Sequence, residues 1–232
     1  MDSSKKKKFF LLISLDQINF VVLSEDRKIL LEKKSLVNDF TVNQNFKTLE
    51  EFLHQNIFDL EKKINNYIKE IDLIINYDDF LTLNVSTIHN FNINDQLINN
   101  SNFFVNIKDN VINNMHDYDL VHMLINKFII DGIEHSTIPK KNDYDKIFLE
   151  IRFVCLKKYI SQSLKKIFSK YEISIKNISC YEYVKNFKNS DTDNIFDLSD
   201  KLRNGLNQKE ILLIDKSHKR LGFFERFFNF FS

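Results

Sequence analysis

The sequence predicts an α+β fold in which mixed β-sheets are flanked by two main helices. Three features of the chain predict this class. Apolar runs rich in β-forming residues open the chain at residues 9–15 and 18–24. Residues 48–70 and 158–171 carry apolar side chains every three to four positions, which is the period of an amphipathic helix. Residues 145–157 alternate between apolar and polar side chains, which is the period of a strand with one buried face.

The first segment of the chain reads as three strands. Residues 9–15 and 18–24 are the first two, and a polar turn then leads into a third at 28–36. Four lysines before the first apolar run resemble the start of a signal peptide, but Asp16 and Gln17 interrupt the run and no small-residue cleavage site follows. We therefore expect an intracellular protein with no transmembrane segment.

The first main helix is expected at residues 48–70. Thr48 and Glu51 have the spacing of a capping box, in which each side chain satisfies a backbone amide at the start of a helix. Short strands are expected next, at residues 72–77 and 80–85.

The middle of the chain alternates between predicted strands and the second main helix. Residues 103–107 have apolar side chains at every second position and read as a strand, and residues 119–130 form a long apolar run. The strand at 145–157 leads into the helix at 158–171, and a further strand is expected at 173–183.

Residues 187–207 are polar and rich in aspartate, which predicts a linker or a loose surface segment. The apolar residues 211–214 within 208–215 indicate an edge strand. A flexible tether of about 20 residues would have a root-mean-square reach of about 25 Å. Such a tether would let the segment that follows it move away from the domain.

The last residues are the most unusual part of the sequence. Six of the nine residues between 223 and 231 are phenylalanine, whereas 23 Phe in 232 residues would place about one in such a window. On a helical wheel the six rings share one side, and Glu225, Arg226 and Asn229 lie on the other. The cationic residues Lys219 and Arg220 lie just before the phenylalanines. We predict that a helix at 222–232 binds an anionic membrane surface, with these membrane-binding residues: Lys219, Arg220, Phe223, Phe224, Phe227, Phe228, Phe230 and Phe231.

The strength of this attachment follows from its size. Full burial of one Phe side chain is worth roughly 1.5–3 kcal/mol, and the helix is far shorter than the about 20 residues that span a bilayer. We therefore expect reversible attachment. There are two alternatives to membrane binding: the rings pack onto the protein's own core, or they pack onto a partner.

Composition and charge narrow the possible functions. Lys and Arg number 33 against 32 Asp and Glu, so no overall basic field favours nucleic acid. The chain has three glycines and no glycine-rich phosphate-binding loop, so we expect neither an enzyme nor a cofactor. Cys155 and Cys180 show no zinc-site spacing and are typical of a reducing compartment. His116, Asp117 and Asp119 are close in sequence, but solvated loop residues explain them better than a metal site.

The middle of the chain resembles FtsA, the actin-like cell division protein of bacteria. Residues 119–139 resemble the family's strand of the type "VLHVIPQEYxIDG…P", and residues 146–178 resemble the strand, helix and strand that follow it. Residues 72–92 resemble the strand that enters the family's inserted subdomain, and the helix at 48–70 lies where the family has one after its first three strands. The resemblance covers residues 9–187. The matched positions in the first motif are His122, Phe128, Ile130, Asp131, Gly132 and Pro139.

The resemblance implies four regions. Residues 9–71 would form a partial actin-like first subdomain, and residues 72–187 a strand-helix-strand-strand interaction subdomain of the SHS2 type. Residues 188–215 would be a linker with an edge strand, and residues 216–232 an amphipathic helix, which in this family tethers the protein to the inner membrane. The implied fold is thus a reduced actin-like first half that carries an SHS2-type module.

The chain departs from the family in two places. The family's first phosphate loop reads Gly-Leu-Asp-Ile-Gly-Thr, and the aligned residues 14–19 read Ser-Leu-Asp-Gln-Ile-Asn, so Asp16 is kept and both glycines are absent. The second half of the actin-like fold, with the surface that binds the tubulin-like ring protein, has no counterpart. ATP binding is therefore not carried over, and binding to the ring filament is not expected.

These observations predict a non-catalytic, membrane-tethered adaptor of the bacterial cell division machinery. It would be peripheral on the cytoplasmic side of the inner membrane, at midcell, with membrane lipids and other division proteins as partners. Self-association is left open, and nucleic acid is not expected to bind. A degenerate actin-like ATPase that uses Asp16, and a pilus or secretion assembly scaffold with the same module, are the alternatives.

Overall fold

The chain forms a mixed α+β fold with two β-sheets and five helices among the residues that the structure describes. The computed structural model describes residues 7–37, 42–77, 80–90, 101–135, 146–190 and 193–212. Two compact units make up the chain. Unit 1 comprises residues 1–79 and 158–201, and unit 2 comprises residues 80–157 and 202–232. The expected α+β class is confirmed, and most of unit 2 is inserted into the sequence of unit 1.

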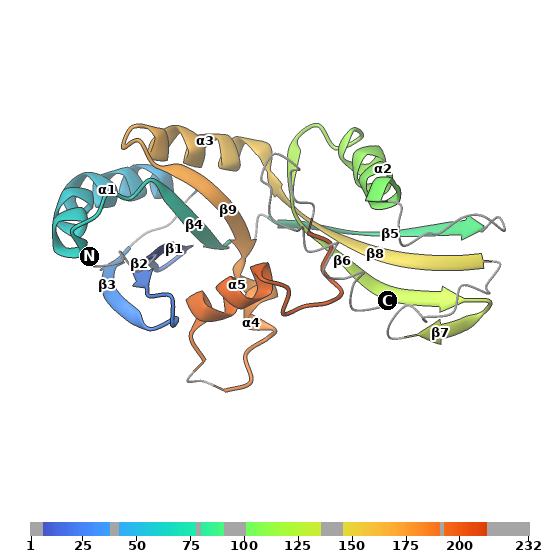
Figure 1. Ribbon diagram of the computed structural model, residues 1–232. Coiled ribbons are helices and arrows are strands. Elements are labelled where there is room, and N and C mark those ends of the chain that lie inside the picture. Colours follow the sequence, from blue (N-terminus) through green and yellow to red (C-terminus); the bar gives the residue numbers. More distant parts are fainter. Residues whose placement is uncertain are drawn as a thin grey trace. The chain divides into compact units, whose positions relative to one another are not determined.

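Unit 1 is built on a five-stranded sheet in the order β3-β2-β1-β4-β9. The hairpin of β1 and β2 and the pairing of β2 with β3 are antiparallel, whereas β4 is parallel to β1 and β9 is parallel to β4 (Figure 1). All five strands were expected from the sequence. Their bounds are β1 Lys8–Ser14, β2 Gln17–Leu23, β3 Ile29–Leu36, β4 Glu70–Asn76 and β9 Ser174–Cys180.

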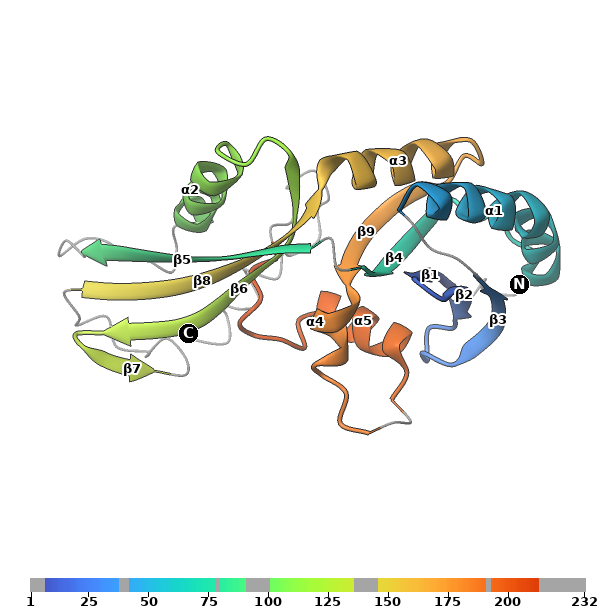
Figure 2. The ribbon, with the colours of Figure 1, turned by 180° about the vertical axis from the view of Figure 1, so that it is seen from behind.

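Helices cover both faces of this sheet, and both faces carry buried apolar side chains. On one face, Phe10 and Ile74 pack with Phe196 of helix α5 (Ile195–Arg203). Because side chains alternate along a strand, Leu11 and Leu73 point to the other face, where each is at most 1% exposed. Helices α1 and α3 lie on that side of the sheet and α5 on the opposite side in both views (Figures 1 and 2).

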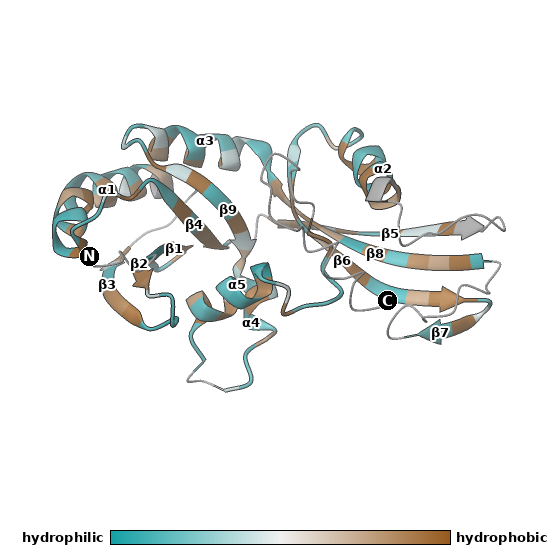
Figure 3. Ribbon diagram, in the orientation of Figure 1, coloured by the Kyte–Doolittle hydropathy of each residue, from teal (hydrophilic) through white to brown (hydrophobic). Residues whose placement is uncertain are grey.

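Helices α1 (Val42–Ile64) and α3 (Lys158–Ser169) are the two main helices that the sequence predicts. Their mixture of apolar and polar residues is visible in Figure 3. Two details of the first prediction were wrong. Thr48 lies inside α1 and does not begin it, and the helix ends before residue 70 because Asn65 has a left-handed φ of 50°. Asparagine tolerates this conformation, which commonly ends a helix.

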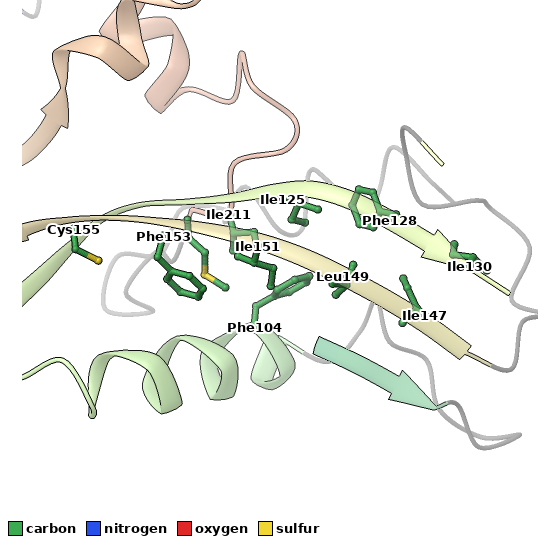
Figure 4. Close-up of a cluster of buried hydrophobic side chains, with 11 residues drawn as sticks. Phe104, Ile125, Phe128, Ile130, Ile147, Leu149, Ile151, Phe153, Cys155 and Ile211 are labelled. Carbon is green, nitrogen blue, oxygen red and sulfur yellow. The ribbon is translucent and has the colours of Figure 1, made fainter. Parts of the chain in front are cut away.

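Unit 2 contains a four-stranded antiparallel sheet in the order β5-β8-β6-β7, with helix α2 packed on one face. The elements follow one another along the chain as strand, helix, strand, short strand and strand. Apolar residues of β6, β8 and α2 form its core (Figure 4). The bounds are β5 Phe80–Asn90, α2 Ser101–Ile112, β6 Tyr118–Ile130, β7 Ile133–His135 and β8 Lys146–Lys157.

The strand predicted at residues 103–107 was wrong, because these residues lie in α2. Three apolar side chains at every second position also fit a helix when further apolar residues continue the helical spacing. Here Phe104 is buried, and Ile107 and Val111 pack against the same core. The face that covers the sheet therefore follows the helical period and not the strand period.

The polar linker predicted at residues 187–207 was also wrong. Helix α4 (Tyr181–Lys185) comes just before this stretch, but α5 lies within it, and Phe196 of α5 is only 4% exposed. The aspartates that suggested disorder do not prevent folding, because Asp200 forms ion pairs with Lys8 and Arg27.

The boundary between the units differs from the one that the sequence suggested. Residues 158–180 were expected in the inserted module together with residues 80–157. In the structure β9 pairs with β4, and α3 packs against β9, so this stretch belongs to unit 1. The parallel partner of β9 is β4, which lies about a hundred residues earlier in the sequence. The residues of β9 therefore do not show by themselves which sheet the strand joins.

Candidate functional site

The residues predicted to bind the membrane, Lys219 to Phe231, lie outside the described residues. No helix in the described part of the chain is both long and apolar enough to span a bilayer. What the structure does describe is the stretch of chain that leads toward these residues, 204–212. We call residues 207–211 the docking segment.

The docking segment is fixed to the outer edge of β6 by backbone hydrogen bonds. A turn begins it, in which the Glu210 amide donates to the Asn207 carbonyl over 3.1 Å. The amide of Ile125 then donates to the Lys209 carbonyl, and the amide of Ile211 donates to the Met123 carbonyl, each over 2.8 Å. Leu124 and Glu210 form the antiparallel bridge between these bonds.

The local shape of β6 leaves room for this segment. The pairing of β6 with β8 shifts register between Leu120 and His122 and again between Ile125 and Lys127. Bulges of this kind bend and twist a strand locally. β7 occupies the outer edge at residues 128–130, and the docking segment occupies it at 123–125.

Two side chains of the docking segment enter unit 2. Ile211 is 9% exposed and belongs to the apolar cluster formed by β6, β8 and α2 (Figure 4). The Glu210 carboxylate lies 2.7 Å from Nδ1 of His122, and both side chains are about 95% buried, with exposures of 5% and 6%. A buried carboxylate requires such a partner, because burial without one is costly. The pair therefore fixes the register of the segment on β6.

The docking segment corrects the predicted tether. Residues 188–215 were expected to form a linker that lets the terminal helix move away. Instead α5 packs on unit 1 and the docking segment is held on unit 2, so the chain is fixed up to Ile211. Only residues 213–221 separate the last described residue from Gly222.

The turn where the resemblance places a phosphate loop is a tight β-hairpin. Leu15 and Asp16 connect β1 to β2, and the Ser14 hydroxyl lies 2.6 Å from Asp16 Oδ1 and 3.0 Å from the Gln17 carbonyl. The Asp16 carbonyl accepts a bond from the Val37 amide over 2.8 Å. Asp16 thus has a structural role in this turn, in agreement with the ordinary explanation of an aspartate at the end of a strand.

A second charged cluster joins α5 to the sheet of unit 1. Nζ of Lys8 lies 2.7 Å from both carboxylate oxygens of Asp200, and Nε of Arg27 lies 3.2 Å from Asp200 Oδ2. Asp197, one turn earlier, contacts Arg27 and Lys201. Because the Asp200 side chain is only 8% exposed, the two cations balance a nearly buried charge.

The cysteine thiols and the possible metal ligands of the described ranges can be assessed directly. Burial, together with the charge of Asp119, raises the pKa of the Cys155 thiol to about 11, and burial also raises the pKa of Cys180. Both cysteines are buried, and neither forms a disulfide. Within the described residues, His, Cys, Asp and Glu form no group of three suited to a metal ion, His116 and its neighbours included.

Little in the sequence indicates the docking segment. Glu210 and His122 are 88 residues apart, and neither lies in a recognisable motif. The one available signal was the apolar run at 211–214, which indicated an edge strand. The contact is a single bridge at Glu210 and not a strand.

Comparisons with known proteins leave the family open. No family model matches the chain, and no curated protein matches its sequence. One similar solved structure is the cytoplasmic domain of EpsL, an inner membrane component of the type II secretion system of Vibrio cholerae, at 10% identity and a TM-score of 0.37 over 80% of this chain and 59% of that one. Another is the PilM-PilN type IV pilus biogenesis complex, at 6% identity and a TM-score of 0.49 over 86% of this chain and 52% of that one. This chain therefore spans less than two thirds of either protein.

Proposed function

We propose that this protein is a non-catalytic adaptor that binds the inner face of the cytoplasmic membrane through residues 219–231 and binds other proteins through its folded units. The docking segment carries the proposal. It fixes the chain to unit 2 up to Ile211, so the aromatic residues begin within a short distance in sequence of a rigid attachment point. Lipid binding by those residues would then hold unit 2 close to the membrane.

The fold of the described residues is consistent with this role. In unit 1 three antiparallel strands are followed by a helix and by parallel strands, and unit 2 interrupts the chain after β4. The resemblance to FtsA implies the same succession of three strands, a helix and an inserted subdomain. Unit 2 has the order strand, helix, strand, short strand and strand, and its first four elements support an SHS2-type module there. On this basis we assign the adaptor to cell division, with pilus or secretion assembly as the alternative.

The ATPase alternative is less well supported. The carboxylate of Asp16 is engaged by the Ser14 hydroxyl within a two-residue turn, and neither turn residue is glycine. A melting temperature that does not change with millimolar ATP and Mg²⁺ is the expected result. A rise that depends on nucleotide concentration would favour the ATPase, because a ligand that binds only the folded state stabilises it.

Liposome co-sedimentation tests the membrane contact. The intact protein should pellet with vesicles of phosphatidylethanolamine and phosphatidylglycerol, and the double variant Phe227→Asp/Phe228→Asp should remain in the supernatant. The matched control is Asn229→Asp/Ser232→Asp, which adds the same charge on the polar side of the predicted helix and should pellet nearly as well as the intact protein. Equal pelleting of the intact protein and the Phe227→Asp/Phe228→Asp variant would exclude the anchor.

The cellular role requires a separate measurement. Imaging of a fluorescently tagged chain in dividing cells should show a band at midcell if the adaptor serves division. Polar or scattered foci would instead support pilus or secretion assembly, without affecting the membrane contact.

A further inference from the structure

Strand β5 of unit 2 differs from the other strands that lie at the edges of the two sheets. An edge strand presents unpaired backbone N–H and C=O groups, and proteins usually protect it with charges, bulges, short length or a cover. β3 carries Glu32, Lys33 and Lys34 and pairs with a register shift, and β9 carries Lys176 and also pairs with a shift. β7 has only three residues.

Among the described residues, β5 has none of these protective features. It is 11 residues long, and its pairing with β8 runs without a register shift over the whole length. Its sequence, FLTLNVSTIHN, contains no Lys, Arg, Asp, Glu, Pro or Gly. Within the described part of the chain, no strand pairs with its outer edge. None of the residues 80–88 is fully buried, and Ile88 is 54% exposed.

We propose that β5 pairs with β5 of a second copy of this chain, in antiparallel orientation and around a two-fold axis that passes through Asn84. Such an isologous contact requires a strand that is complementary to itself. Residues directly opposite one another in an antiparallel pair lie on the same face of the sheet. With Asn84 opposite Asn84, positions whose numbers are equally far from 84 become partners.

This register matches like with like on both faces. On the face that α2 covers, Leu83 stands opposite Val85, and these two side chains already pack against the core of unit 2. On the other face Thr82 stands opposite Ser86 and Phe80 opposite Ile88. Leu81 opposite Thr87 is the one pair of mixed polarity.

Charge also selects this partner. A charged partner strand would lose hydration of its charges on pairing with β5, and β5 has no opposite charges to compensate. A second β5 brings no charged side chain, so neither desolvation of charges nor like-charge repulsion opposes the pairing. Pairing over nine residues buries less surface than most stable interfaces, so we expect a weak dimer that strengthens at high local concentration. The inference does not depend on the proposed function, although a membrane surface would supply such a concentration.

Charge at the axis tests the pairing in solution. Sedimentation equilibrium of the full chain should show a monomer–dimer equilibrium, and Asn84→Lys should weaken it by about tenfold or more, because two like charges would face each other at the axis. Asn84→Asp should weaken it equally. An equimolar mixture of the two variants should restore the dimer, which misfolded variants would not do. Asn84 is exposed, and its side-chain oxygen accepts only a long hydrogen bond of 3.4 Å from Nδ2 of Asn126 among the bonds described, so both variants should fold.

Disulfide cross-linking tests the register. Residues directly opposite in an antiparallel pair have Cα atoms about 4.5–5.5 Å apart, which a disulfide can span. Asn84→Cys should therefore form a covalent dimer under mild oxidation, whereas the native thiols are buried. Thr82→Cys should cross-link to Ser86→Cys in a mixture and not to itself, because the two Thr82 residues would be about 13 Å apart. A monomer at all concentrations, a dimer that tolerates Asn84→Lys, or self-linking of Thr82→Cys would each overturn the proposal.

Discussion

Helix α5 and the docking segment follow one another in the chain, but they are attached to the protein by different interactions. α5 binds unit 1 through side chains, with Phe196 in an apolar cluster and Asp200 paired to two cations. The docking segment is held in unit 2 mainly through its backbone, with one buried carboxylate–imidazole contact and one apolar side chain. Side-chain attachment can be removed one residue at a time, whereas a backbone bridge is less sensitive to any single substitution.

The largest expected effect is on α5. Phe196→Ala removes a ring that is 4% exposed and lies 6.1 Å, centroid to centroid, from Phe10. The free energy of unfolding should fall by about 3–5 kcal/mol, measured by urea denaturation. Phe58→Ala on α1 is the control, because that ring is 73% exposed. Equal losses for the two variants would mean that α5 contributes little to unit 1.

The docking segment should respond more weakly and more locally. Glu210→Ala leaves His122 without its buried carboxylate and should cost about 1–3 kcal/mol. Hydrogen exchange should accelerate at the amides of Ile125 and Ile211, which form the bridge to β6, and hardly change in unit 1. Glu134→Ala, at a residue whose side chain is 61% exposed, is the control. Unchanged exchange at both amides would show that the backbone alone holds the segment.

The ion pairs of α5 should contribute less than its aromatic ring. Asp200→Asn keeps the shape of the side chain and removes the charge that faces Lys8 and Arg27, so we expect a loss of about 1–2 kcal/mol in the free energy of unfolding. Asp59→Asn, at an exposed position of α1, should have almost no effect. A loss as large as that of Phe196→Ala would reverse the proposed ranking of the two interactions.

These elements also show how far the sequence predicts the structure. The central strands of unit 1 follow from short apolar runs that are buried on both faces, and the two main helices follow from apolar side chains every three to four positions. α5 was missed because its aspartates suggested solvent exposure, whereas Asp200 pairs with Lys8 and Arg27, which are distant in sequence. Near the docking segment, the sequence predicts only an edge strand. The contact with His122 could not be predicted because His122 lies 88 residues away. Of the candidate site, the sequence predicts the aromatic residues but not the point at which the chain is held.

The smallest expected effect is a difference in alkylation rate between Cys155 and Cys180, which compares how readily the two units open. Since burial raises the pKa of both thiols, to about 11 for Cys155, alkylation at pH 8 should require local opening of the structure. Cys180, 9% exposed at the end of β9, should react before the fully buried Cys155 in β8. Mass spectrometry of timed iodoacetamide reactions would give the order. Faster labelling of Cys155 would mean that unit 2 opens more readily than unit 1.

The insertion of unit 2 into unit 1 has a consequence for synthesis on the ribosome. β4 cannot pair with β9 until about a hundred further residues have been synthesised, because Glu70 pairs with Ser174. Every strand of the second sheet, in contrast, lies within residues 80–157. Pairing over short separations along the chain is faster, and nascent chains emerge one end first. The four-stranded sheet of unit 2 should therefore be assembled while the edge of β4 that pairs with β9 is still open, and that edge would rely on a chaperone or on rapid elongation to avoid aggregation.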